Sequence, residues 1–158
     1  MRGSDPDAAI YWLAKMISGG EDPRFIARRL IVTAAEDVGN ADPQALLLAL
    51  AAAESIDRLG LPEARIPLAQ AVIYIARAPK DNTVITAIDD ALNDIQEKGL
   101  SYPVPDHLKD THYRDAKRRY GYCVDYKYPH DYPGNQVEQT YRHDRFKDHR
   151  YYVHEEER

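Results

Sequence analysis

The residues that could do chemistry are gathered at one end of this chain. Ten of the twelve tyrosines, all six histidines and the single cysteine, Cys123, lie within residues 102–158. Imidazole, thiol and phenol groups can bind metals, move protons or act as nucleophiles. Almost all aliphatic residues lie before residue 102, so the chain joins two physically different parts.

The histidine spacings argue against a metal site and against an enzyme. His107 and His112 are five residues apart, which places them on different sides of a helix, and no cysteine pair accompanies them. His130 and Asp131, beside Tyr128, could imitate the acid and base of a phosphodiesterase, but no second carboxylate cluster or nucleophile motif supports that interpretation. We therefore predict no catalytic residue, metal or cofactor in this chain, and expect His130 and Asp131 to hold a loop by hydrogen bonds to the backbone.

A basic stretch with interleaved tyrosines suggests a second kind of chemistry, the binding of single-stranded DNA. Cations pair with phosphates, and aromatic rings stack on bases. The candidate nucleic-acid-binding residues are Lys109, Arg114, Lys117, Arg118, Arg119, Tyr120 and Lys127. The plainer interpretation is a solvated helix face, and it is favoured because the net charge of the chain is −5.

The tyrosine-rich run after residue 125 cannot lie inside a helix, because its two prolines remove backbone donors. We expect an ordered, extended structural loop in which Pro133 and Gly134 form a type II turn. The loop residues are Tyr126, Tyr128, Pro129, His130, Asp131, Tyr132, Pro133 and Gly134. Few aliphatic residues accompany them, so this tail is expected to pack on a helical core and not to fold alone.

Residues 1–101 carry repeated start and stop signals of helices. Ser4 and Asp7 form a capping-box pattern around Pro6, and Asp-Pro pairs at residues 22–23 and 42–43 begin two further helices. Glycine ends most of them. The expected helices cover about residues 6–18, 23–38, 44–59, 67–78 and 83–98, and a sixth is expected from about residue 106 to 119.

Two of these helices have informative apolar patterns. The helix at residues 44–59 is apolar nearly all round, which predicts burial on most sides. In the fifth helix, Ile85, Ile88, Leu92 and Ile95 repeat at spacings of three and four, the seam expected of bundle packing. The predicted fold is all-α: a bundle of about five to six helices with a Tyr/Pro-rich extended tail. Residues 1–101 form the bundle and residues 102–158 the sixth helix and tail, in one structural unit.

Composition limits the classes of function. The sequence has neither a secretory leader nor an apolar run of about 18 residues, so we expect a cytoplasmic protein without membrane contact. Five helices cannot all turn wide apolar faces toward one centre, so we also expect an exposed apolar surface that contacts another subunit.

The order of residues along the whole chain resembles the C-terminal region of the RarA/MgsA proteins, which are AAA+ replication-associated recombination ATPases. A long ordered set of matches is far harder to meet by chance than one short motif. The matching segments are residues 2–9, 11–14, 22–23, 26–30, 36–39, 69–74, 107–110, 112–113, 116–117, 126–134, 137–139 and 151–152.

The resemblance implies a piece from the end of a longer ATPase, whose preceding module would hold ATP and magnesium. This chain contains no Gly-x-x-x-x-Gly-Lys-Ser/Thr loop and no Asp-Glu at the end of an apolar strand, so we expect no ATP hydrolysis from it. In the family, this region is a helical collar similar to those of clamp loaders, and it assembles a homotetramer. The expected partners are other copies of the chain and the ATPase module. Single-stranded DNA and single-stranded-DNA-binding protein are alternatives.

Overall fold

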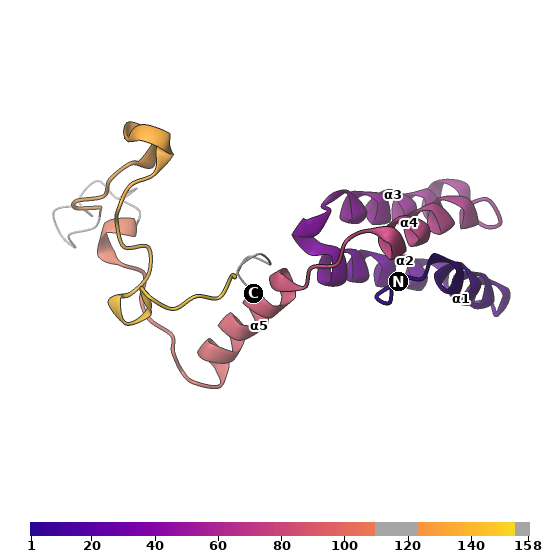
Figure 1. Cartoon of the computed structure of the whole chain (residues 1–158), viewed down its shortest axis with the longest axis horizontal. Coiled ribbons are helices and arrows are strands. Elements are labelled where there is room, and N and C mark those ends of the chain that lie inside the picture. Colours follow the sequence, from indigo (N-terminus) through magenta and orange to yellow (C-terminus); the bar gives the residue numbers. More distant parts are fainter. Residues whose placement is uncertain (110–122, 154–158) are drawn as a thin grey trace. The chain divides into compact units, whose positions relative to one another are not determined.

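The computed structural model describes residues 1–109 and 123–153 as two compact units (Figure 1). One unit comprises residues 1–91 together with residues 151–153, and the other comprises residues 92–109 and 123–150. Helices and turns, with no strand, make up the described residues, so the predicted all-α class is confirmed. Within these residues, no helix has the length and apolar character needed to cross a membrane.

Five α-helices carry the fold in the part of the chain that the structure describes. They are α1 (Pro6–Ser18), α2 (Pro23–Thr33), α3 (Gln44–Leu59), α4 (Arg65–Arg77) and α5 (Thr83–Gln96). Helix α4 packs against both α1 and α3, and α3 also packs against α2, so that α1 to α4 form a bundle (Figure 1).

The helix starts follow the predicted chemistry, with one correction. The carboxylate of Asp5 caps α1 by accepting a hydrogen bond from the Ala8 N–H at 2.9 Å, and Pro6 occupies the first turn. The predicted cap, Ser4, instead lies outside the helix with φ 57°. Asp22 caps α2 through the Arg24 N–H as expected. Asp5 rather than Ser4 caps the helix because its carboxylate lies directly before Pro6, where the free N–H groups of the first turn begin.

The bundle core is built largely on alanine. Among the described residues, ten of the eighteen buried apolar residues are alanines, so the helix axes can approach closely. In α3 the buried residues are Ala45, Ala49, Ala52 and Ile56. The prediction that α3 is buried on most sides is therefore wrong: its small side chains face the core, whereas Leu47 and Leu50 are exposed.

Helix α2 does not continue in regular form to Gly39. It passes into a π-helical turn, η1 (Ala34–Val38), followed by a 3₁₀ turn, η2 (Gly39–Ala41). A π turn holds one residue more than an α turn and commonly marks a functional position. Here it buries Ala34, Asp37 and Val38 at the end of the helix.

The second unit consists mainly of short turns: η3 (Asp106–Leu108), η4 (Pro129–Asp131), η5 (Pro133–Asn135) and η6 (Asp144–Phe146). The predicted type II turn is confirmed, because Gly134 has φ 68° and ψ 11° and the Asn135 N–H donates to the Tyr132 carbonyl at 3.1 Å. The predicted sixth helix begins as the 3₁₀ turn η3, and its residues 110–119 lie outside the described residues. The packing of the tail on the helices stays a prediction.

Gly39 is a position where only glycine fits. Its φ of 53° and ψ of −131° are strained for any residue with a Cβ, and a Cβ there would lie 2.8 Å from the Asp81 carbonyl oxygen. We expect Gly39→Ala to lower the free energy of unfolding by about 3 kcal/mol, as strain and the clash combine. Gly20→Ala is the matched control, since Gly20 has φ 79° with open space around it and should cost only about 1 kcal/mol. Urea denaturation measures both, and equal losses would contradict the close approach.

Candidate functional site

Asp81 fixes the first turn of α5 to the bundle. Its backbone N–H donates to the Asp37 carbonyl at 2.9 Å. Its carboxylate accepts hydrogen bonds from the Thr83 N–H at 2.8 Å and from the Thr83 hydroxyl at 2.9 Å. Asp81 and Thr83 are buried, so these bonds form away from water. The Asp81 carboxylate therefore caps the start of α5, and we call this set of contacts the α5 anchor.

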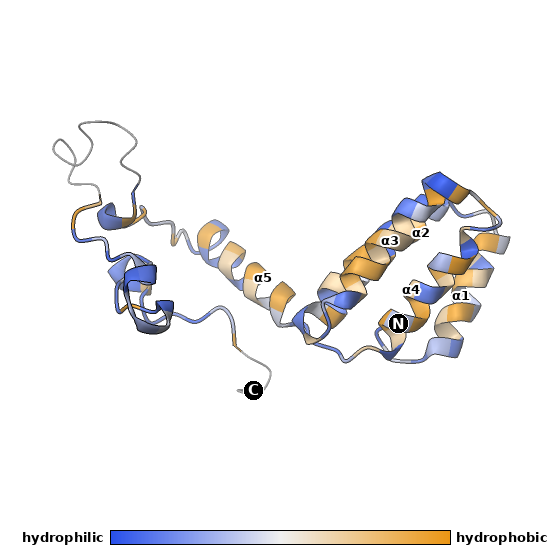
Figure 2. Cartoon of the chain, turned by 90° about the horizontal axis from the view of Figure 1, so that it is seen from above, coloured by the Kyte–Doolittle hydropathy of each residue, from blue (hydrophilic) through white to orange (hydrophobic). Residues whose placement is uncertain are grey.

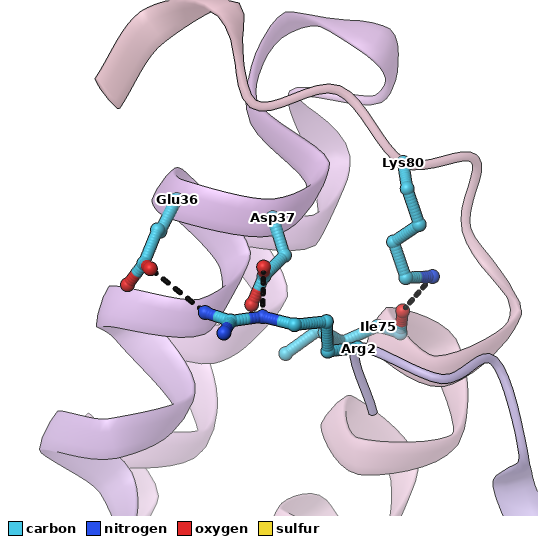
Figure 3. Close-up of polar contacts among 5 residues, drawn as sticks. All are labelled: Arg2, Glu36, Asp37, Ile75 and Lys80. Atoms are coloured by element: carbon cyan, nitrogen blue, oxygen red, sulfur yellow. Dashed lines mark hydrogen bonds and ion pairs between the residues drawn. The ribbon is translucent and has the colours of Figure 1, made fainter. Parts of the chain in front are cut away.

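Arg2 ties the start of the chain to the same place (Figure 3). Its Nε atom donates to Asp37 at 2.6 Å, and its Nη2 atom donates to Glu36 at 2.7 Å. The hydrogen bond and charge of Asp37, followed by the charge of Glu36, raise the pKa of the guanidinium. Arg2 is largely solvent-exposed, whereas Asp37 is buried. The buried carboxylate therefore has its partner at the protein surface.

Lys80 closes the end of α4 (Figure 3). Its ammonium donates to the carbonyls of Ile75, Ala76 and Ala78 at 3.0, 3.2 and 2.5 Å. These carbonyls have no partner within the helix, and the C-terminal end of the helix dipole favours a positive charge. Burial lowers the pKa of Lys80, and the negative charge of Asp37 opposes that shift.

These groups line a cleft of about 390 Å³ between the start of the chain, η1 and the start of α5. The cationic groups of Arg2 and Lys80 and the carboxylates of Asp37 and Asp81 already have partners inside the protein. The cleft therefore offers no free nucleophile or acid–base pair. The groups of the cleft have a structural role, because their hydrogen bonds hold the start of α5 against the bundle.

Helix α5 is amphipathic (Figure 2), and its aliphatic side is exposed together with most of its polar side. Five aliphatic residues lie within about 100° of arc, and we call them the α5 apolar face. Ile88, Leu92 and Ile95 are 51%, 41% and 51% exposed. On the far side of the same helix, Thr83 and Asp94 are buried. The face comprises Val84, Ile85, Ile88, Leu92 and Ile95.

A second apolar surface lies between α1 and α4. It is a groove of about 500 Å³ in which hydrocarbon predominates, and we call it the α1/α4 groove. Ile66 is 61% exposed at its edge, and Arg65 is its one charged residue. The lining residues are Ile10, Leu13, Ala14, Ile17, Ser18, Arg65, Ile66 and Ala69.

The predicted nucleic-acid-binding residues are not brought together in the described part of the chain. Lys109 pairs with Asp106 at 2.5 Å, and the Lys127 ammonium donates to the Glu138 carbonyl at 3.1 Å. Both cations thus have protein partners. Arg114, Lys117, Arg118, Arg119 and Tyr120 lie outside the described residues, so this site stays a prediction.

The tyrosine loop is held by side chains. His130 Nδ1 lies 3.1 Å from the Asn135 side-chain oxygen, and its ring lies 5.1 Å from that of Tyr128. The sequence predicts a backbone partner for the His130 ring, whereas the structure gives it the side chain of Asn135. For Asp131 the backbone N–H makes the bond, to the Tyr128 carbonyl at 3.0 Å. Tyr126, Tyr128 and Tyr132 are partly exposed, so their rings are available surface and not a core.

Sequence reasoning missed a cluster around Asp94. This buried carboxylate pairs with Lys98 at 2.7 Å and with His149 at 3.2 Å. Tyr102 stacks on His143 at 4.6 Å and meets Phe146 edge-on at 5.3 Å. His143, Phe146 and His149 follow one another at intervals of three residues. That regular spacing of rings was the signal in the sequence that could have indicated the cluster.

A protein-family model described as the C-terminal region of the MgsA AAA+ ATPase matches residues 3–158 of the chain. This chain belongs to the MgsA AAA+ ATPase C-terminal family. The RarA/MgsA resemblance inferred from the sequence is thereby confirmed. The α5 anchor and the two apolar surfaces are thus features of an MgsA C-terminal domain.

Individual relatives agree with the family. Replication-associated recombination protein A of Bacillus subtilis is 51% identical over 96% of this chain and 35% of its own length. An uncharacterized AAA domain-containing protein of Mycobacterium tuberculosis is 50% identical over 96% of this chain and 33% of its own length. ATPase WRNIP1 of Dictyostelium discoideum is 37% identical over 89% of this chain and 16% of its own length. The chain spans about a third of the length of the two bacterial relatives.

The α5 anchor can be tested by removing the cap. We expect Asp81→Ala to lower the free energy of unfolding by about 1–2 kcal/mol and to speed hydrogen exchange of the Thr83 amide, because that N–H loses its acceptor. Asp81→Asn should retain most of the stability, since an amide oxygen can also cap a helix. Equal exchange rates in the Ala and Asn variants would show that the carboxylate does not fix this turn.

Proposed function

We propose that this domain joins copies of a AAA+ ATPase into a homotetramer and contributes no catalysis of its own. The whole protein would act in the cytoplasm in replication-associated recombination and repair at replication forks. The names of its relatives, a AAA domain-containing protein and replication-associated recombination protein A, support this setting.

The exposed aliphatic side of α5 is the observation that carries the proposal. A helix in a monomer turns its aliphatic side toward protein and its polar side toward water. In α5, three of the aliphatic residues are about half exposed while polar Thr83 and Asp94 are buried. Burying one such aliphatic side chain contributes about 1.5–3 kcal/mol, so another protein surface is the favourable place for this face.

A second copy of the same chain fits this face better than a small ligand. The aliphatic spacing of three, four and three residues from Ile85 to Ile95 is the pattern that lets helices interlock side chains. These five side chains are already about half buried, so covering the rest supplies about 5 kcal/mol of gross burial, whereas association costs about 4–15 kcal/mol of lost freedom. A single contact is thus marginal, and an assembly in which each copy makes two contacts is stable.

The groups suited to chemistry support a role without catalysis. His107 Nε2 lies 2.7 Å from the Thr140 carbonyl, His130 contacts Asn135 and His149 pairs with Asp94. Each of these imidazoles thus has a structural partner.

The proposal predicts that charge on α5 breaks self-association. We expect the wild-type chain at micromolar concentration to have the mass of a tetramer by multi-angle light scattering. Ile88→Asp with Leu92→Asp should reduce that mass to one copy, because two carboxylates would enter an apolar contact.

Leu47→Asp is the matched control, since Leu47 is an equally exposed aliphatic residue on α3. It should leave the mass unchanged, and circular dichroism should show the same helix content in all three proteins. A monomeric wild-type chain would refute the proposal, and an α5 variant that keeps the mass of a tetramer would show that a surface other than α5 joins the copies.

A further inference from the structure

We propose that the α5 apolar face of one copy docks into the α1/α4 groove of the next copy, so that neighbouring copies meet head to tail. The inference rests on the proposed self-association and assigns its two surfaces. The chain carries both halves of this contact: an amphipathic helix whose aliphatic side is exposed and an apolar groove between two other helices.

The shape of the groove suits a helix. Ala14 and Ala69 lie along it and are small enough for a third helix to approach closely. Ile10, Ile17 and Ile66 provide larger side chains on either side, between which those of α5 can insert. From Ile10 to Ile17 the groove covers about two helical turns, and the α5 apolar face from residue 84 to 95 covers about three. Laying an amphipathic helix into an apolar groove is a recurring mode of protein recognition.

The charges of the two surfaces are complementary. Asp89 follows Ile88 at the border of the α5 apolar face and is exposed. Arg65 is the charged residue of the groove and is also exposed, with one nitrogen donating to the Pro62 carbonyl at 2.6 Å. A guanidinium has five N–H groups, so Arg65 keeps donors for an incoming carboxylate. Docking of α5 therefore brings an acidic border to a basic edge.

The same charges disfavour the simpler alternative, in which two α5 helices pair with each other. An antiparallel pair about a two-fold axis brings the midpoints of the two helices together. Asp89 borders the α5 apolar face near the midpoint of Thr83–Gln96, so the two copies of Asp89 would lie beside that contact without a cation opposite them. Lys98, the nearest lysine, lies beyond the end of the helix and pairs with Asp94.

A head-to-tail contact uses different surfaces on the two partners and so leaves each copy with one free helix and one free groove. Closing four copies into a ring satisfies every helix and every groove. This gives each copy the two contacts that make the proposed assembly stable.

Mixing two variants tests the pairing of surfaces. The first variant carries Ile88→Asp and Leu92→Asp and keeps an intact groove. The second carries Ile66→Asp, which places a charge in the groove and keeps α5 intact; Ile66 is 61% exposed, so the core is not disturbed. We expect each variant alone to be monomeric by light scattering. An equimolar mixture at about 1 mM, a concentration at which a weak single contact can form, should give a dimer and nothing larger, because it contains only one kind of intact contact.

Each other outcome has a distinct meaning. If the Ile66→Asp variant keeps the wild-type mass while the α5 variant is monomeric, the groove is not the docking site and self-association through α5 still stands. If both variants alone are monomeric and their mixture also stays monomeric, the head-to-tail pairing is wrong. If the α5 variant keeps the mass of a tetramer, docking through α5 is wrong, and if the wild-type chain is itself monomeric, the proposed function fails.

A charge exchange checks the contact with both apolar surfaces intact. Arg65→Glu and Asp89→Arg should each weaken association by about two- to fivefold, the range of an exposed ion pair, and the double variant should recover most of the wild-type affinity. Additive losses in the double variant would show that these two residues do not meet.

Discussion

Close packing on alanine is the constraint on which the rest of this structure depends. With the small residues Ala45, Ala49 and Ala52 on its inner side, α3 can approach its neighbours closely. The bulky residues Leu47 and Leu50 are thereby left outside. A bundle of this kind obtains its order from many close backbone contacts, and its larger aliphatic side chains remain available for other surfaces.

The position of α5, in contrast to those of α1 to α4, is determined by polar contacts. Helix α5 does not pack extensively on α1 to α4, so its start is set by the Asp81 hydrogen bonds and by the close approach of Gly39. Polar bonds have directions, and buried ones are costly to break. They can therefore hold the first turn of a helix in place while its aliphatic side stays free for another molecule.

The local elements of this fold could be predicted from sequence, whereas the side chosen by each helix could not. Asp22, Gly60 and Pro79 mark helix limits through chemistry that acts within a few residues. The bounds of α3 and the buried stripe of α4 at Leu68, Val72 and Ile75 were accordingly predictable. Whether Leu47 or Ala49 faces the core depends on the distance to a neighbouring helix, which periodicity does not encode. The pairing of Arg2 with Asp37 spans 35 positions, and nothing local to either residue indicates it.

The π turn at the end of α2 has a consequence for how this segment can change. Its extra residue rotates everything after it by about a quarter turn relative to a regular α-helix. Deleting one residue before Asp37 in Ala34–Val38 would restore a regular α-helix. It would also move the Asp37 carboxylate away from the guanidinium of Arg2. Related proteins that differ in the lengths of their loops should therefore have the same number of residues between Thr33 and Gly39.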